Sequence, residues 1–111
     1  MVSLASKQKN RISMRILHLT LNKKWFDMIR SGIKKEEYRE IKPYWRKRLL
    51  NKFFDVIQFR NGYAKTAPCF TIELTGFYRG LGIVEWGAPE KEEVFILRLG
   101  EIITNVDTRT V

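Results

Sequence analysis

Cysteine and histidine are almost absent from this chain of 111 residues, which contains one residue of each type, Cys69 and His18. A disulfide needs a second cysteine, and a zinc site of cysteine and histidine ligands needs more donors than these two residues supply. We therefore expect no disulfide and no metal, and nothing in the sequence predicts a cofactor. Cys69 opens an apolar, strand-like segment and is expected to be a small buried residue. His18 alternates with Leu17 and Leu19, so we expect it on the opposite, partly exposed face of a strand and not as a catalytic base.

Long hydrophobic runs are also missing. No segment approaches the roughly 20 apolar residues that cross a bilayer, and residues 1–13 lack the apolar stretch of a signal peptide. The segment Gly80-Leu81-Gly82 is not followed by the Gly-Lys-Ser/Thr ending of a Walker-type phosphate loop. We expect a cytoplasmic protein with no membrane partner and no site of the Walker type.

The charges that are present are unevenly distributed. The chain has 21 basic and 12 acidic residues, for a net charge of +9. Residues 1–65 hold 17 basic and 5 acidic residues, a balance of +12, whereas residues 66–111 hold 4 and 7, a balance of −3. A positive field attracts phosphate groups and weakens as salt is added. Basic and aromatic residues interleave at residues 42–48 (KPYWRKR), which favours a nucleic-acid partner over a merely solvated lysine surface.

Length and hydrophobic pattern predict one domain of the α+β class, mainly β. A chain of 111 residues has room for a single core. We expect that domain over residues 14–104, a basic and flexible arm over residues 1–13, and a tail over residues 105–111. Many strands, only two short helices and no repeated strand-helix-strand pattern predict a small, mostly antiparallel barrel whose closure hides the sheet edges. The expected strands are residues 15–21, 35–41, 53–59, 69–78 and 94–99, the last extended by 100–103; the expected helices lie between Asn22 and Gly32 and over 44–52.

The segment GIKKEEYR at residues 32–39 combines a helix stop with a dense group of charges. Gly32 is expected in the left-handed conformation that ends many helices. Strand alternation places Glu37 and Arg39 on one face and Tyr38 on the other, so we expect Tyr38 to be structural. Lys34, Glu37 and Arg39 offer a mobile cation, an acceptor and a planar donor fork, a set that suits a nucleotide. The alternative is an ion-pair ladder on an exposed sheet, worth under about 1 kcal/mol per pair.

The same eight residues resemble the Gly-x-Lys-x-x-Glu-x-Arg signature of the ASCH domain family, which is related to the PUA fold. The resemblance extends over roughly residues 15–103 and includes the position of the signature directly after a helix. It implies a pseudo-barrel of five or six strands with two or three short helices. It also implies an RNA-binding cleft beside the signature, with Lys34, Glu37 and Arg39 as cleft residues and Gly32 as the structural stop.

Some small members of this superfamily look like amidohydrolases that remove an acyl group from a modified cytidine, using a lysine, a threonine and a glutamate. The lysine has a counterpart in Lys34, but Glu37 stands where those proteins have the threonine. A carboxylate does not replace a hydroxyl nucleophile, because its acyl product is an anhydride and not an ester. The alternative function therefore gives Lys34 and Glu37 acid/base or activating roles. Glu85 is a further acid/base candidate, although an ordinary exposed loop carboxylate is the simpler interpretation.

Several other residues are candidates for RNA or nucleotide contacts. Arg46 and Lys47 lie in the basic helix and are expected to contact the phosphate backbone. Arg60, Asn61 and Tyr63 lie in a predicted Asn-Gly hairpin turn, where Arg and Asn suit base edges and Tyr suits stacking.

Two of these candidates have plain structural alternatives. Asn61 is also explained by a turn that needs a positive φ. Trp86, in the glycine-rich loop over residues 79–90, is a stacking candidate or a plug for the end of the barrel.

The leading hypothesis is an RNA-binding module that holds a single-stranded or modified nucleotide beside residues 32–39. The first alternative is the amidohydrolase. The second is an accessory domain that binds a partner through the apolar loop around Trp86. The sequence predicts neither the natural ligand nor the oligomeric state.

Overall fold

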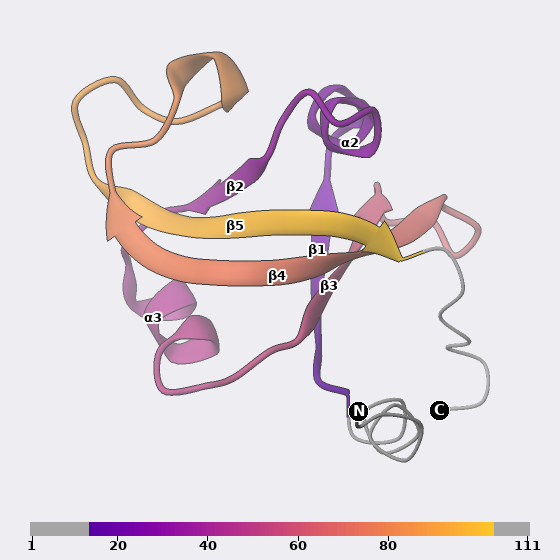
Figure 1. The fold of residues 1–111 in the computed structure, drawn as a ribbon, viewed down its shortest axis with the longest axis horizontal. Helices are drawn as coiled ribbons and strands as arrows, with labels where there is room; N and C mark the ends of the chain where they lie inside the picture. The colour runs from indigo at the N-terminus through magenta and orange to yellow at the C-terminus, as the bar shows by residue number, and fades with distance from the viewer. Residues whose placement is uncertain (1–13, 104–111) are drawn as a thin grey trace, which may run out of the picture.

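The structure, a computed structural model, describes residues 14–103 and has five strands, two α-helices and one 3-10 turn in that part of the chain (Figure 1). The predicted arm over residues 1–13 and tail over residues 105–111 lie outside it. The mainly β, α+β class is confirmed. The elements are β1 (Ile16–Leu21), α2 (Lys23–Arg30), β2 (Glu36–Arg39), α3 (Pro43–Leu49), β3 (Val56–Asn61), β4 (Cys69–Gly80), η1 (Val84–Trp86) and β5 (Val94–Ile103).

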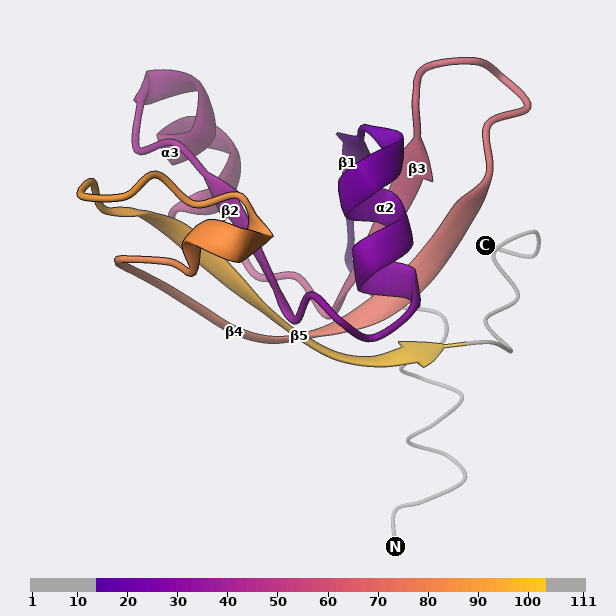
Figure 2. The ribbon, with the colours of Figure 1, turned by 90° about the horizontal axis from the view of Figure 1, so that it is seen from above.

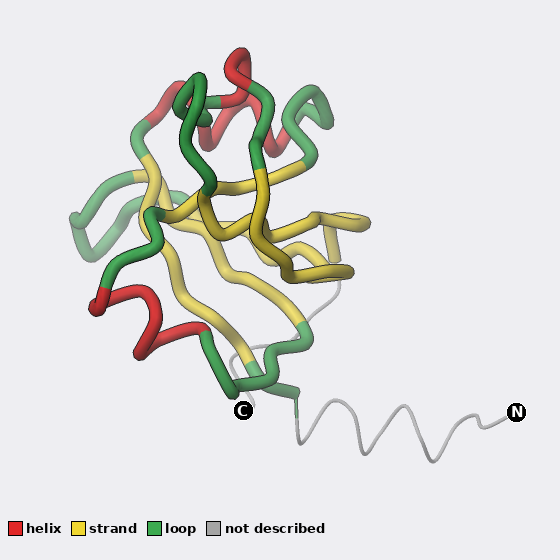
Figure 3. Tube along the Cα trace, turned by 90° about the vertical axis from the view of Figure 1, so that its left-hand side faces the viewer, coloured by secondary structure: helices red, strands yellow, loops and turns green. Residues whose placement is uncertain are grey.

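The five strands form one sheet in the order β1-β3-β4-β5-β2. β1 and β3 are parallel, and the other three neighbouring pairs are antiparallel. The sheet curls into a half-barrel, with α3 near one arm and α2 near the other (Figures 2 and 3). Within residues 14–103 the edge strands β1 and β2 do not pair with each other, so the predicted closure of the barrel is wrong. β2 has only four residues, and arginine side chains, described below, meet the free edge of β1.

The core lies on the concave face of this sheet, under both helices. Phe26 and Ile29 reach it from α2, and Leu49 reaches it from α3. The strands contribute buried side chains that include Leu17, Leu19, Leu21, Ile57, Phe59, Ile72, Phe95, Leu97 and Leu99. Trp25 and Trp45 pack against this core while remaining partly exposed.

Local sequence signals explain where α2 begins and ends. The Asn22 side chain accepts a hydrogen bond from Trp25 N (3.2 Å), which caps the first turn. Gly32 has a φ of 88°, in the left-handed region, as predicted. The N–H groups of Gly32 and Ile33 donate to Ile29 O and Met28 O, both at 3.0 Å, which is the Schellman pattern of helix termination.

The helix α3 and the strand β3 are shorter than predicted. Pro43 occupies the first helical turn, where its missing N–H is not needed. The helix stops at Leu49, and Asn51 then takes a left-handed φ of 60°. β3 begins at Val56, so residues 50–55 form a connecting loop in place of helix and strand.

The hairpin between β3 and β4 is present, but the predicted Asn-Gly turn is wrong. Asn61 is the last residue of β3, and residues 62–68 separate it from Cys69. The positive φ belongs to Gly62 (92°) and not to Asn61. Gly62 N donates to Leu21 O (3.1 Å), so the chain continues along β1 before it returns.

Predictions for the two rare residues and for Gly76 have mixed outcomes. His18 is exposed between buried Leu17 and Leu19, as expected. Cys69 is exposed, so the prediction of a buried residue is wrong; it pairs with Arg60 in the last register position of the β3–β4 ladder, at its margin. The bulge predicted at Gly76 is confirmed by register shifts between Ile72 and Gly76.

No helix within residues 14–103 is long and apolar enough to cross a membrane.

Candidate functional site

The residues predicted to be functional at 34–39 form one group, buried at Lys34 and Glu37 and partly buried at Arg39, which we call the charge network: Lys34, Glu37 and Arg39. Lys34 Nζ lies 3.4 Å from Glu37 Oε1, and Arg39 Nη2 lies 2.6 Å from Glu37 Oε2. The exposed side-chain fractions are 1% for Lys34, 8% for Glu37 and 16% for Arg39. These values exclude the exposed ion-pair ladder that the sequence left as an alternative.

Lys34 is the most enclosed member of the charge network. Its ammonium donates to the backbone carbonyl of Trp86 and lies over the rings of Trp25 (5.1 Å) and Tyr38 (4.6 Å). Burial lowers the pKa of Lys34 from its ordinary value, because desolvation of the ammonium outweighs the attraction of Glu37. The lysine is therefore more easily deprotonated than an exposed lysine.

Arg39 is the member most open to solvent. Its guanidinium lies 4.8 Å from the Trp45 ring of α3, and Nη2 also donates to Thr20 O of β1 (3.4 Å). The Nε atom is buried and has no hydrogen-bond partner in the described part of the chain. This Nε–H donor of the guanidinium is therefore unused. Leaving such a donor buried without a partner costs free energy.

The fold around Gly32 and β2 explains how three charged side chains meet in the interior. The Schellman turn at Gly32 brings Lys34 N to within 2.9 Å of Met28 O, so Lys34 leaves the helix end in a fixed direction. Glu37 pairs with Leu97 of β5, and Arg39 pairs with Phe95, so both polar side chains share the concave face with core residues. The alternation predicted for these two residues is confirmed.

The loop over residues 81–88 covers Lys34 from a distant part of the sequence. Gly87 has a φ of 104°, and a Cβ at that position would lie 3.1 Å from the Trp25 ring. A Cβ at Gly82 would lie 2.5 Å from the Tyr38 ring. Tyr38 OH accepts from Ile83 N (3.0 Å) and donates to Glu36 Oε1 (2.7 Å). Tyr38 thus fixes this loop, a structural role consistent with its predicted position on the opposite face from Glu37.

Two arginines meet the free edge of β1. Arg39 Nη2 donates to Thr20 O, and Arg48 Nη2 donates to His18 O (3.2 Å). Both guanidinium groups lie over Trp45, at 4.8 and 5.4 Å. Side chains from β2 and α3 therefore satisfy backbone acceptors that a paired strand would satisfy in a closed barrel.

The other predicted residues lie outside the charge network. Arg46 and Lys47 are exposed on α3, one and two residues after Trp45. Arg60 is held within the β3–β4 connection, where it donates to the carbonyls of Gly62 (3.3 Å) and Ala64. Tyr63 is 89% exposed, so it remains available for stacking.

Three further candidates, Asn61, Glu85 and Trp86, contribute no side chain to the charge network. Asn61 is partly exposed at the end of β3. Trp86 meets the charge network through its backbone carbonyl, whereas Glu85 is exposed. Among residues 14–103 there is no group of three or more histidine, cysteine or carboxylate side chains able to hold a metal ion.

Comparison of the chain with models of known protein families, with curated protein sequences and with solved structures gave no match. The site must therefore be interpreted from its own geometry. Sequence reasoning missed Trp25, Trp45 and Thr20 as neighbours of the cations. Trp45 had a usable signal, since it stands among the basic residues at 42–48, whereas the contact with Thr20 O depends on how β1 and β2 face each other.

Proposed function

We propose that this protein is an ASCH-like domain that binds single-stranded RNA or a modified nucleotide at the charge network. The observation that carries the proposal is a group of two cations and one carboxylate, buried at Lys34 and Glu37 and partly buried at Arg39, in which Arg39 Nε has no hydrogen-bond partner among residues 14–103. When Lys34 is protonated this group has one net positive charge. Such a charge is costly to bury unless an acceptor or anion compensates it.

The surroundings of the charge network also favour a nucleotide. The Arg39 guanidinium lies over the Trp45 ring, and its planar group presents its donors in one plane, as recognition of a phosphate or a base edge requires. Arg46 and Lys47 are exposed on the same helix as Trp45, in position to contact a backbone that passes the site. The PUA-like relationship is an expectation from the sequence signature and is part of this proposal.

RNA binding tests the proposal directly. The wild-type protein should bind a mixed-sequence, single-stranded RNA oligonucleotide in fluorescence anisotropy, and the affinity should fall as salt increases from about 50 to 200 mM. Arg39→Lys keeps the charge but removes the planar fork, so it should weaken binding. Absence of binding at the lower salt concentration, or binding indifferent to salt, would contradict the proposal.

A second candidate is hydrolysis of an acylated cytidine or a similar modified nucleoside. The lowered pKa of Lys34 is the specific observation in its favour, because a lysine that loses its proton more readily suits acid/base work. Incubation with acylated cytidines separates the two functions. Turnover that Lys34→Ala abolishes would support the enzyme, whereas RNA binding without turnover would support the binding module.

A further inference from the structure

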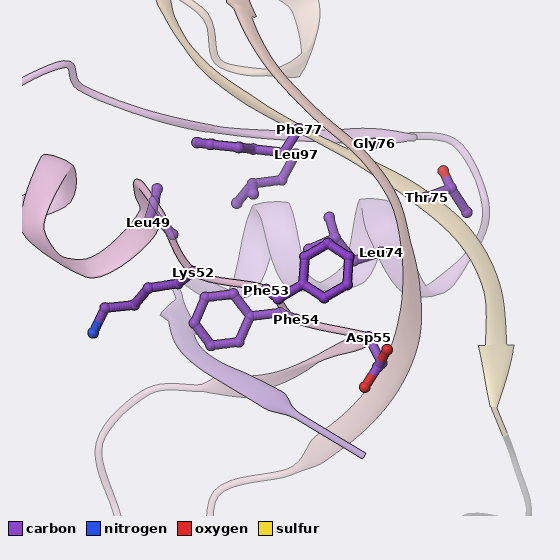
Figure 4. Close-up of a pocket in the computed structure, with 10 residues that line it drawn as sticks. All are labelled: Leu49, Lys52, Phe53, Phe54, Asp55, Leu74, Thr75, Gly76, Phe77 and Leu97. Atoms are coloured by element: carbon purple, nitrogen blue, oxygen red, sulfur yellow. The ribbon is translucent and has the colours of Figure 1, made fainter. Parts of the chain in front are cut away.

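A pocket of about 520 Å³ opens between the loop that follows α3 and the strands β4 and β5 (Figure 4). Small-molecule sites typically have volumes of about 300–1,000 Å³. Phe53 is 73% exposed and Phe77 37% exposed. Exposed rings of this kind can stack against a flat ring that enters from solvent. The apolar side chains that line the pocket are Leu49, Phe53, Phe54, Leu74, Phe77 and Leu97. We call it the phenylalanine pocket.

The phenylalanine pocket and the charge network lie on the same face of the sheet. Glu37 of β2 is the register partner of Leu97 of β5, and Leu97 is in turn the partner of Phe77 of β4. Directly opposed residues of antiparallel strands point to the same face, with Cβ atoms about 4.5–5.5 Å apart. Leu97 therefore lies between Glu37 of the charge network and Phe77 of the phenylalanine pocket.

The helix α3 connects the two sites on their outer side. Trp45, in its first turn, lies against the Arg39 guanidinium, and Leu49, at its end, lines the phenylalanine pocket. These two residues, four positions apart, share the side of the helix that packs on the core, whereas Arg46 and Lys47 are exposed. Their positive charge attracts the phosphate backbone of an RNA strand that passes between the two sites.

Two charged residues on the phenylalanine pocket complement a nucleotide. Lys52 is exposed and forms no ion pair within residues 14–103; its ammonium points outward from the pocket, where a phosphate would follow a bound base (Figure 4). Asp55 Oδ2 accepts from Arg15 N (2.8 Å), which holds the carboxylate in place. A carboxylate has room for further donors: the exocyclic amines of adenine, cytosine and guanine each carry two N–H groups, whereas uracil offers only its N3–H.

We propose that the phenylalanine pocket binds an unpaired nucleobase that neighbours the nucleotide held at the charge network in the same RNA strand, with Phe53 as the stacking ring. This inference rests on the proposed function. The inference also includes a base preference: through Asp55, the phenylalanine pocket should favour bases with an exocyclic amine over uracil.

The test compares Phe53→Ala with the wild-type protein on two oligonucleotides, a cytosine-rich single-stranded RNA and the same sugar-phosphate backbone without bases. Phe53 is largely exposed, so its replacement should leave the fold intact, as circular dichroism would verify. We expect Phe53→Ala to bind the cytosine-rich RNA about 5- to 150-fold more weakly, the range for loss of one base-aromatic stack. It should bind the abasic strand as tightly as the wild-type protein does. Cys69→Ala, which shortens an exposed side chain outside both sites, is the control and should bind both strands normally.

The outcomes separate this inference from the function beneath it. If the wild-type protein binds RNA and Phe53→Ala binds it equally well, the base subsite is wrong while the proposed function stands. Equal weakening on the abasic strand would also overturn the inference, because the loss would not come from stacking. Failure of the wild-type protein to bind any RNA would overturn both. A uridine-rich RNA that binds the wild-type protein as tightly as the cytosine-rich RNA would overturn the role of Asp55.

Discussion

The charge network and the basic surface of α3 contain the same kinds of residue in opposite surroundings. Lys34, Glu37 and Arg39 are nearly enclosed and are held by aromatic rings and backbone carbonyls. Arg46 and Lys47 lie a few residues away along the chain, exposed on a short helix. Buried charges interact strongly and depend on their partners, whereas exposed charges are hydrated and screened by salt. The buried set is therefore suited to fix geometry, and the exposed set to attract a phosphate backbone from a distance.

The largest effect should come from removing the carboxylate at the centre of the charge network. Glu37→Ala leaves the buried Lys34 and the partly buried Arg39 without their counter-charge, so we expect a loss of about 3–5 kcal/mol in the free energy of unfolding. Thermal or urea unfolding measures it. The control is Glu93→Ala, which breaks the ion pair between Arg79 and Glu93, where both side chains are more than half exposed; its loss should stay under about 1 kcal/mol. Equal losses in the two variants would mean that the ion pairs of Glu37 contribute no more to the free energy of unfolding than a surface ion pair does.

The next largest effect should come from crowding the cover over Lys34. A methyl group at Gly82 would lie 2.5 Å from the Tyr38 ring and 2.7 Å from Ala88 Cβ, so Gly82→Ala must displace the loop. We expect a loss of about 1–3 kcal/mol in the free energy of unfolding. Gly80→Ala is the control, because its Cβ would lie 3.8 Å from the nearest atom, an ordinary contact with Ile96. Unfolding curves that do not differ between the two variants would contradict the close packing of Tyr38.

The titration of Lys34 predicts a pH dependence of the free energy of unfolding. Burial lowers the pKa of Lys34 below its ordinary 10.5, so between the two values the unfolded chain holds more protons than the folded one. Stability should therefore rise with pH in that interval, by up to about 1.4 kcal/mol per pH unit. Burial raises the pKa of Tyr38 above its ordinary 10.0, so ionisation of this phenol should reverse the trend above about pH 10.

The contribution of Lys34 is isolated by comparing the wild-type protein with Lys34→Met. Urea unfolding of both proteins over a series of pH values below 10 should give a steeper increase for the wild-type protein. Parallel curves would show that Lys34 keeps the same proton affinity in both states, contrary to its burial.

The smallest effect on stability should come from the exposed cations of α3. Arg46→Ala and Lys47→Ala should each change the free energy of unfolding by less than about 0.5 kcal/mol. Each should nevertheless weaken RNA binding to a similar extent for all sequences and lower the dependence of log affinity on log salt by about one ion. Lys91→Ala removes an exposed lysine from the acidic half of the chain and should leave both quantities unchanged. If the loss of affinity in these variants depended on the RNA sequence, Arg46 and Lys47 would contact bases and not the phosphate backbone.

Much of this arrangement could be predicted from the sequence because the signals are local. Asn22 and Gly32 mark the ends of α2 by capping chemistry, and strand alternation places Glu37 and Arg39 on one face. The open barrel could not be predicted, because it depends on which strands pair and on arginines that meet the edge of β1. The burial of Lys34 also escaped prediction, since its cover comes from residues 81–88, about 50 positions later in the sequence.

Two local signals misled the prediction for physical reasons. The Asn-Gly pair is typical of a tight turn, but contacts with β1 hold this chain extended through Asn61 and give the positive φ to Gly62. Phe53 and Phe54 resemble the start of a strand. The left-handed Asn51 instead directs them into a loop, where they line the phenylalanine pocket.

The central claim is that Arg39 of the charge network contacts a bound nucleotide, and the NMR signal of its Nε–H group tests this most directly. In the free protein this buried group has no hydrogen-bond partner within the part of the chain that the structure describes. The account predicts that saturation with single-stranded RNA shifts the Arg39 Nε–H resonance together with the indole resonance of Trp45. If the resonances of α3 shift on addition of RNA while that of Arg39 stays unchanged, RNA binds to the basic surface alone and the charge network is not the binding site.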